Sequence, residues 1–232
     1  AYEIRPRDWS SDVCSSDLCR VVAGQAHHVL HVLRLKAGDA LTLFDGRGAE
    51  YAARITQVEK SGLTLSVSER REVSRESPLR VTLAQGISSG ERMDYTVQKC
   101  VELGVAAIQP LLTQRSVVRL SGDRADKRAA HWQSVAIAAC EQCGRNHVPP
   151  VLPVQPLTQW LSTPPAGARI LLAPQAATPL RELPRPQGPI TLLVGSEGGW
   201  DDTETAAAMR AGFAPLRSEE HTSELQSRGL IS

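Results

Sequence analysis

The chain carries the sequence ITLLVGSEGG at residues 190–199. The run of leucine and β-branched residues at 190–194 predicts a strand that is buried on both faces, as in a parallel sheet. The three glycines that follow allow a sharp turn and a close approach of a ligand to the main chain. Ligands of open α/β sheets bind beyond the carboxyl ends of the strands. The stretch therefore predicts a small-molecule site, with a glycine-rich turn that binds nothing as the alternative.

Strand and helix patterns alternate through this part of the chain. The helix expected at residues 91–103 places Met93, Val97, Cys100 and Val101 in one stripe, and Gly104 is suited to end it. The alternation predicts a parallel sheet with helices on its faces. Strands are expected at 79–84, 106–111, 151–154, 170–172 and 190–194, and further helices at 123–143 and 201–211.

The preceding region has a different pattern of apolar and polar residues. Between residues 24 and 69, one short helical pattern at 29–35 is followed by three alternating runs at 40–44, 50–55 and 63–67. Aspartate-glycine and serine-glycine pairs between these runs are turn signals, so we expect a small β-barrel. Residues 68–78 are charged, lack an apolar period and end in Ser-Pro, which predicts a linker.

One DNA segment accounts for both ends of the chain. The sequence RSEEHTSELQS at residues 217–227 can be encoded by a segment whose opposite strand reads WSSDVCSSDL, the sequence of residues 9–18. The segment resembles a common sequencing adapter. We therefore expect residues 1–18 and 217–232 to be artefacts, exclude them from functional reasoning, and expect the natural gene to continue past Leu216.

Composition places the chain among ordinary globular proteins. It has 232 residues, 41% of them hydrophobic and 22% charged, with a mean hydropathy of −0.21. No apolar stretch approaches the length of a membrane span, so we expect no membrane association. The net charge is +1, and without the two suspect ends it becomes +4, from 22 basic and 18 acidic residues. This mildly basic balance is compatible with an RNA partner but does not require one.

The cysteines do not suggest a disulfide framework. There are five, and one of them, Cys14, lies in a suspect end. Such sparse usage suits a reducing cytoplasm. Cys140, Cys143 and His147 form an incomplete zinc set, and their alanine-rich helical setting favours buried structural thiols over a metal site.

Two polar patterns each leave two interpretations open. Ser88, Ser89 and Gly90 precede the helix expected at 91–103, where free amides would suit an anion such as a phosphate or an ordinary N-cap. A basic series would suit an RNA backbone or a solvated surface, since acidic residues are interleaved and Lys99 has Glu102 three positions on. The series comprises Arg92, Lys99, Arg115, Arg119, Arg124, Lys127 and Arg128.

Several segments, each modest alone, become specific when taken in order. They are VLRLKAG at 32–38, LFDG at 43–46, ERMD at 91–94, QK at 98–99, ELGV at 102–105, QP at 109–110, Arg115, AACEQCGR at 138–145, and GSEGG at 195–199. From about His28 to Leu216 the chain resembles the bacterial small-subunit (16S) ribosomal RNA uridine-N3 methyltransferase E family. This family is part of the SPOUT class of knotted methyltransferases.

The resemblance implies an α/β enzyme with a PUA-like RNA-binding β-barrel at 19–70, a linker at 71–78 and a SPOUT methyltransferase domain at 79–216. That domain contains a parallel sheet and a trefoil knot. The implied reaction uses S-adenosylmethionine to methylate N3 of a uridine in 16S rRNA. The implied partner is the 30S subunit during ribosome biogenesis, and a cytoplasmic homodimer is also implied.

The resemblance also assigns roles to particular residues. Two loops at strand ends would bind the cofactor, and basic side chains would face rRNA phosphates. Glu141 and Arg145 are our candidates for the catalytic uridine side, and no metal is expected. The cofactor residues would be Leu172, Ala173, Pro174, Gly195, Glu197 and Gly198, and the RNA-binding residues Arg92, Lys99, Arg115 and Arg119.

The chain departs from the family pattern in two places. The family loop usually has proline where this chain has Ser196, so the loop is expected to be less preorganised. The family continues after Leu216 with a Leu-Gly-x-Arg-Ile-Leu-Arg-Thr-Glu-Thr-Ala motif that completes the knot and the cofactor pocket. We therefore expect an incomplete knot and an inactive or poorly folded chain. The alternatives are an RNA-binding module without methyl transfer and a zinc-dependent protein.

Overall fold

A computed structural model describes residues 2–3, 18–22, 28–32, 34–59, 62–116, 120–179, 182–183 and 186–217. The chain forms two compact units. The first contains residues 1–76 and 137–148, and the second contains residues 77–136 and 149–232. Apart from residues 2–3, 18 and 217, the two suspected adapter segments lie outside the described residues. Among the residues described, no helix combines the length and apolar character that a membrane crossing requires.

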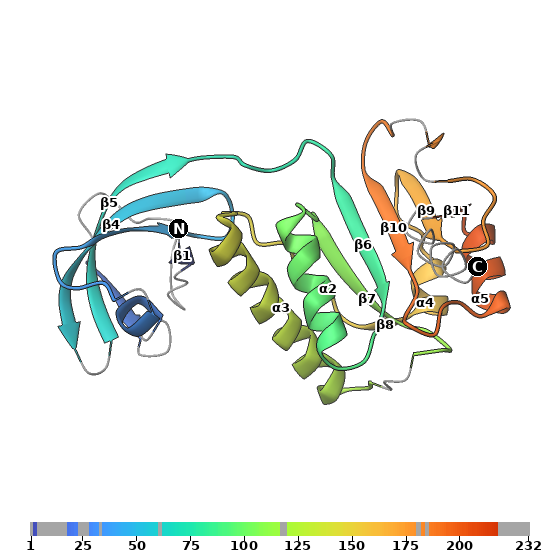
Figure 1. The fold of residues 1–232 in the computed structure, drawn as a ribbon, viewed down its shortest axis with the longest axis horizontal. Coiled ribbons are helices and arrows are strands. Elements are labelled where there is room, and N and C mark those ends of the chain that lie inside the picture. Colours follow the sequence, from blue (N-terminus) through green and yellow to red (C-terminus); the bar gives the residue numbers. More distant parts are fainter. Residues whose placement is uncertain are drawn as a thin grey trace, which may run out of the picture. The chain divides into compact units, whose positions relative to one another are not determined.

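The first unit is built on a five-stranded sheet with the order β1-β3-β4-β5-β2 (Figure 1). The pairs β3–β4, β4–β5 and β5–β2 are antiparallel, while β1 pairs with β3 in parallel. The elements are β1 (Tyr2–Glu3), β2 (Leu18–Val22), the π-helix η1 (His28–Val32), β3 (Ala40–Phe44), β4 (Ala49–Glu59) and β5 (Gly62–Glu72).

Alternation of apolar and polar residues builds the core of this unit. Along β4, Tyr51, Ala53 and Ile55 are buried while the residues between them are exposed. Leu63 and Leu65 of β5 join the same cluster. Because successive side chains of a strand point to opposite faces, this period of two puts one face of the sheet in the core. The sequence predicted a small β-barrel, and the structure has a mainly antiparallel β-sheet domain over this region.

A segment distant in sequence completes the first unit. The side-chain amide of Asn146 donates to the main-chain carbonyls of Gly48 (3.2 Å) and Val73 (2.6 Å) and to Glu50 (3.2 Å). Arg145 donates from Nε to Glu76 at 2.9 Å and also through Nη2. The sequence patterns did not predict that residues 137–148 belong to this unit. They also placed a linker from residue 68, whereas β5 continues to Glu72.

The second unit is built on a six-stranded sheet in which every pair is parallel, with the order β11-β9-β10-β6-β7-β8 (Figure 1). The predicted parallel α/β domain is confirmed. The run at Ile190–Val194 forms β10, which pairs with β6 on one side and β9 on the other. The other strands are β6 (Val81–Gly86), β7 (Ala107–Leu112), β8 (Gln155–Pro156), β9 (Ala168–Leu172) and β11 (Ala214–Leu216).

Helices pack against this sheet through the stripes that the sequence predicted. In α2 (Glu91–Glu102), Met93, Val97 and Val101 are fully buried, and Gly104 follows the helix with a φ of +90°. The helix α3 (Asp123–Cys143) lies beside α2, and His131 contacts Asp94 at 2.9 Å. The helices α4 (Leu157–Leu161) and α5 (Asp202–Arg210) cover one face of the sheet in a shared core cluster.

Short elements account for most differences between expectation and structure. A strand was expected at 151–154, but the structure has only a single bridge at Val151, followed by the two-residue β8. Neither α4 nor β11 was expected. Both are too short to display a full period of hydrophobic side chains, and tertiary packing rather than local pattern establishes them.

Candidate functional site at the carboxyl edge of the parallel sheet

The stretch that follows β10 forms a tight turn. The main-chain N–H of Gly199 donates to the carbonyl of Ser196 at 2.9 Å, and Gly199 has a φ of +70°. A Cβ on Gly195 would lie 3.3 Å from both the carbonyl carbon of Gly199 and the Trp200 ring. Glycine is therefore needed twice, once for a left-handed conformation and once for close packing.

This turn packs against the ends of β6, which neighbours β10, and of β7, the next strand in the sheet. A Cβ on Gly86, the last residue of β6, would lie 2.7 Å from the nitrogen of Ser196. A Cβ on Gly198 would lie 3.0 Å from the Cβ of Arg115, which follows β7. The side-chain amide of Gln85 donates to the carbonyl of Gly195 at 2.8 Å. Three strand ends are thus tied to one glycine turn.

The loop after β9 joins the same edge. The indole N–H of Trp200 donates to the carbonyl of Leu172 at 3.0 Å. The N–H of Ala173 donates to the carbonyl of Leu216 in β11 at 2.9 Å, and Pro174 comes next and is exposed. The structure therefore brings together the two loops that the sequence predicted to bind a cofactor.

Glu197 reaches from the turn to the start of α2. Its carboxylate accepts hydrogen bonds from the hydroxyl (2.5 Å) and the main-chain N–H (3.0 Å) of Ser89, and Arg92 lies 3.4 Å away. The bonds from Ser89 lower the pKa of Glu197 to about 2. One interpretation of the sequence was that the main-chain N–H of Ser89 donates to an external anion. In the structure it donates to the carboxylate of Glu197 instead.

Glu204 fixes the loop after β7. Its carboxylate is buried and accepts a hydrogen bond from the main-chain N–H of Gln114 at 2.8 Å. It also completes a capping box with Asp201 at the start of α5. In the same loop, the guanidinium of Arg115 donates to the carbonyl of Gly198 at 3.2 Å. The loops after β7 and β10 are consequently held by two separate contacts.

The predicted RNA-binding residues differ in their surroundings. The side chain of Arg92 is 70% exposed although it pairs with Glu197, and Arg115 is exposed beside the glycine turn. Lys99 forms the i,i+3 ion pair with Glu102 at 2.7 Å, and this hydrogen bond raises the pKa of the ammonium. Arg119 lies outside the described residues.

The two predicted catalytic residues belong to the first unit, whereas the glycine turn belongs to the second. Glu141, near the end of α3, is partly buried, and desolvation raises the pKa of its carboxyl. Arg145 is buried and holds Glu76 through two guanidinium nitrogens. Although desolvation opposes it, the hydrogen bond to Glu76 raises the pKa of Arg145.

The sequence predicted buried structural thiols at Cys140 and Cys143, and the structure agrees at one of these two positions. Cys140 is buried and Cys143 is exposed. Their thiols contact main-chain carbonyls, that of His147 at 3.5 Å for Cys140 and that of Cys140 at 3.9 Å for Cys143. Within the part of the chain that the structure describes, no three His, Cys, Asp or Glu side chains gather in a way that would hold a metal ion.

Comparisons with known proteins agree with this architecture. The RNA methyltransferase domain family matches residues 75–221, and the RNA methyltransferase PUA domain family matches residues 23–68. Ribosomal RNA small subunit methyltransferase E from Buchnera aphidicola subsp. Schizaphis graminum is 31% identical over 192 residues, which cover 82% of this chain and 78% of the relative. The chain belongs to the ribosomal RNA small subunit methyltransferase E family.

Other members support the assignment over most of the chain. The Bacillus subtilis enzyme of the same name is 28% identical over 226 residues, covering 91% of this chain and 88% of the relative. A solved structure of the Neisseria gonorrhoeae enzyme bound to S-adenosylmethionine has a TM-score of 0.83 and 42% identity, covering 89% of this chain and 85% of that chain. A Legionella pneumophila protein in complex with the same cofactor has a TM-score of 0.84 and 36% identity, covering 89% of this chain and 86% of that chain.

Sequence patterns missed the residues that hold this edge together. Gln85, Gly86, Trp200 and Glu204 all contact loops that are distant in sequence. For Glu204 a signal existed, because an aspartate followed three residues later by a glutamate is a capping pattern. The other three contacts depend on the order of strands in the sheet, which alternation alone does not give.

Proposed function

We propose that this chain catalyses the methylation of N3 of a uridine in 16S ribosomal RNA, with S-adenosylmethionine as methyl donor. Family membership supports the reaction class, and the relatives' name supports the small-subunit rRNA substrate. Two similar structures were solved with S-adenosylmethionine bound. The observation that carries the proposal is the meeting of the loops after β9 and β10 at the carboxyl edge of a parallel sheet (Figure 1).

The residues at this edge fit the cofactor. Gly195 and Gly198 let the turn pack closely against Trp200 and Arg115, where side chains would collide. The buried hydroxyl of Ser196 has no partner within the described structure. When bound, S-adenosylmethionine supplies an electrophilic methyl group. We propose that two loops hold it through Leu172, Ala173, Pro174, Gly195, Glu197 and Gly198.

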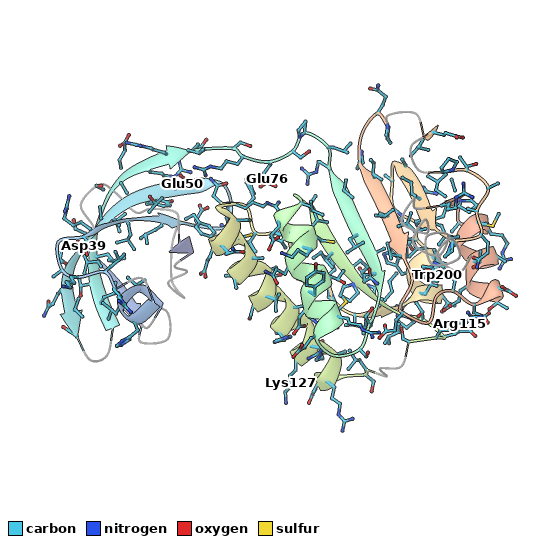
Figure 2. All side chains as sticks on the ribbon, viewed as in Figure 1. Asp39, Glu50, Glu76, Arg115, Lys127 and Trp200 are labelled. Carbon is cyan, nitrogen blue, oxygen red and sulfur yellow. The ribbon has the colours of Figure 1, made fainter. Side chains whose placement is uncertain are left out.

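The rRNA would meet basic side chains near this edge. Arg92 and Arg115 are exposed and flank the glycine turn through their contacts with Glu197 and Gly198. Their positive charges suit phosphate groups, which contribute most of the sequence-independent affinity for RNA. We propose the same role for Lys99 and Arg119. Figure 2 labels Arg115 and Trp200, which contribute to the same edge.

The reaction requires that the N3 proton of uridine leaves as the methyl group arrives. We propose Glu141 as a residue on the uridine side of the reaction, without assigning it the proton. Arg145 remains the proposed partner on the uridine side. Stabilisation of the developing anionic base by positive charge would lower the barrier further. We also propose that the enzyme acts in the cytoplasm as a homodimer.

Calorimetry with S-adenosylmethionine tests the cofactor assignment directly. The printed chain is compared with one in which residues 217–232 are replaced by the family-type C-terminal segment, since we propose that residues 1–18 and 217–232 derive from an adapter. The protein that binds is then incubated with 30S subunits, and 3-methyluridine is measured by nucleoside mass spectrometry. Product formation is expected. If both chains are folded and bind RNA but neither binds the cofactor, the RNA-binding module is the better description.

A further inference from the structure

Ser196 is a buried residue whose hydroxyl has no hydrogen-bond partner in the described structure. It is 7% exposed and lies at the start of the glycine turn. More than nine in ten buried polar groups in proteins are paired, because an unpaired one keeps the cost of leaving water without compensation. A buried hydroxyl in a prospective binding loop therefore calls for a specific explanation.

The neighbouring polar groups are already used. The hydroxyls of Thr113 and Ser116 hydrogen-bond each other at 2.8 Å. The amide nitrogen of Gln85 donates to the carbonyls of Gly86 and Gly195 at 2.9 and 2.8 Å. These groups are thus paired with one another, while the hydroxyl of Ser196 has no partner in the described structure.

We propose that the hydroxyl of Ser196 is a direct hydrogen-bonding contact for bound S-adenosylmethionine. The inference rests on the proposed function, and it adds a specificity contact that a proline at this position lacks. The hydroxyl can both donate and accept, so it matches the polar groups that S-adenosylmethionine carries. The empty protein bears the cost of the unpaired hydroxyl, and the ligand removes it.

This arrangement predicts opposite effects of one substitution on the empty and the loaded protein. Ser196→Ala removes only the hydroxyl, so the melting temperature of the empty chain should stay the same or rise. The dissociation constant for S-adenosylmethionine should increase about fivefold, the change that corresponds to one neutral hydrogen bond. A hydroxyl with only a structural role would lower the melting temperature and weaken binding together.

The test combines calorimetry and thermal melting, carried out in the version of the chain that binds the cofactor. Ser162→Ala is the matched control, because that hydroxyl is exposed and already donates to the carbonyl of Gln159 at 2.6 Å. The control should leave the dissociation constant unchanged. Equal affinity of Ser196→Ala and the parent overturns the inference, as does a lower melting temperature of the empty variant. Failure of the parent itself to bind would instead reject the proposed function.

Discussion

The carboxylate of Glu197 caps the N-terminal end of α2 through the main-chain N–H and the hydroxyl of Ser89, at 3.0 and 2.5 Å. Gly90 is the N-cap residue of α2 and, as a glycine, has no side chain with which to cap the helix. The free amides at a helix start favour a negative charge. A residue 108 positions away in the sequence supplies that charge, so α2 and the glycine turn hold each other in place.

Acid should release this contact. Because the folded-state pKa of Glu197 is lowered from 4.5 to about 2, its stabilising contribution is present above pH 4.5 and is lost as the pH falls towards 2. The difference in unfolding free energy between the parent and Glu197→Gln should therefore be constant near neutrality and shrink below pH 4.5. Urea unfolding at a series of pH values measures it.

Arg92→Ala is the control for the acid response. It removes an exposed ion pair at 3.4 Å but leaves both bonds from Ser89 intact, so most of the pH dependence should remain. A Glu197→Gln variant whose stability follows that of the parent at every pH would refute the capping role.

Glu204 offers a test of the loop after β7. Its buried carboxylate accepts from the main-chain N–H of Gln114, and Glu204→Ala leaves that donor without a partner. We expect a loss of about 2 kcal/mol in unfolding free energy. Glu204→Gln keeps an acceptor oxygen and should lose clearly less. Similar losses for the two variants would show that the hydrogen bond contributes little.

The sequence predicted the regular elements well where the pattern of side chains was unbroken. The limits of α3 and β10 coincide with the predicted ranges 123–143 and 190–194, because each has an unbroken pattern of side chains. The sequence also placed both predicted cofactor loops at strand ends. Residues 137–148 joined the first unit unexpectedly, because Asn146 uses its amide to contact main-chain carbonyls far away in sequence. No local pattern reports such a contact.

Trp200 should matter for the cofactor more than for the fold. Trp200→Phe keeps an aromatic ring but loses the N–H that donates to Leu172. The unfolding free energy should fall by about 1 kcal/mol, and affinity for S-adenosylmethionine should fall because the loops after β9 and β10 lose their connection. Trp160→Phe is a suitable control, since Trp160 belongs to the same core cluster as Trp200 and its ring packs on Phe213. An unchanged affinity in Trp200→Phe would exclude the connection as a determinant of binding.

Arg145 and Glu141 can be separated by their effects on stability. Arg145→Ala leaves the partly buried Glu76 without its cation, and we expect a loss of about 3 kcal/mol in unfolding free energy, with activity falling as the fold weakens. Arg71→Ala removes an exposed ion pair in the same unit and should change the unfolding free energy little.

Glu141→Gln should instead lower methyl transfer about a hundredfold at unchanged stability. Urea unfolding and single-turnover rates decide both cases, and full activity in a stable Glu141→Gln enzyme would remove Glu141 from the proposed uridine side.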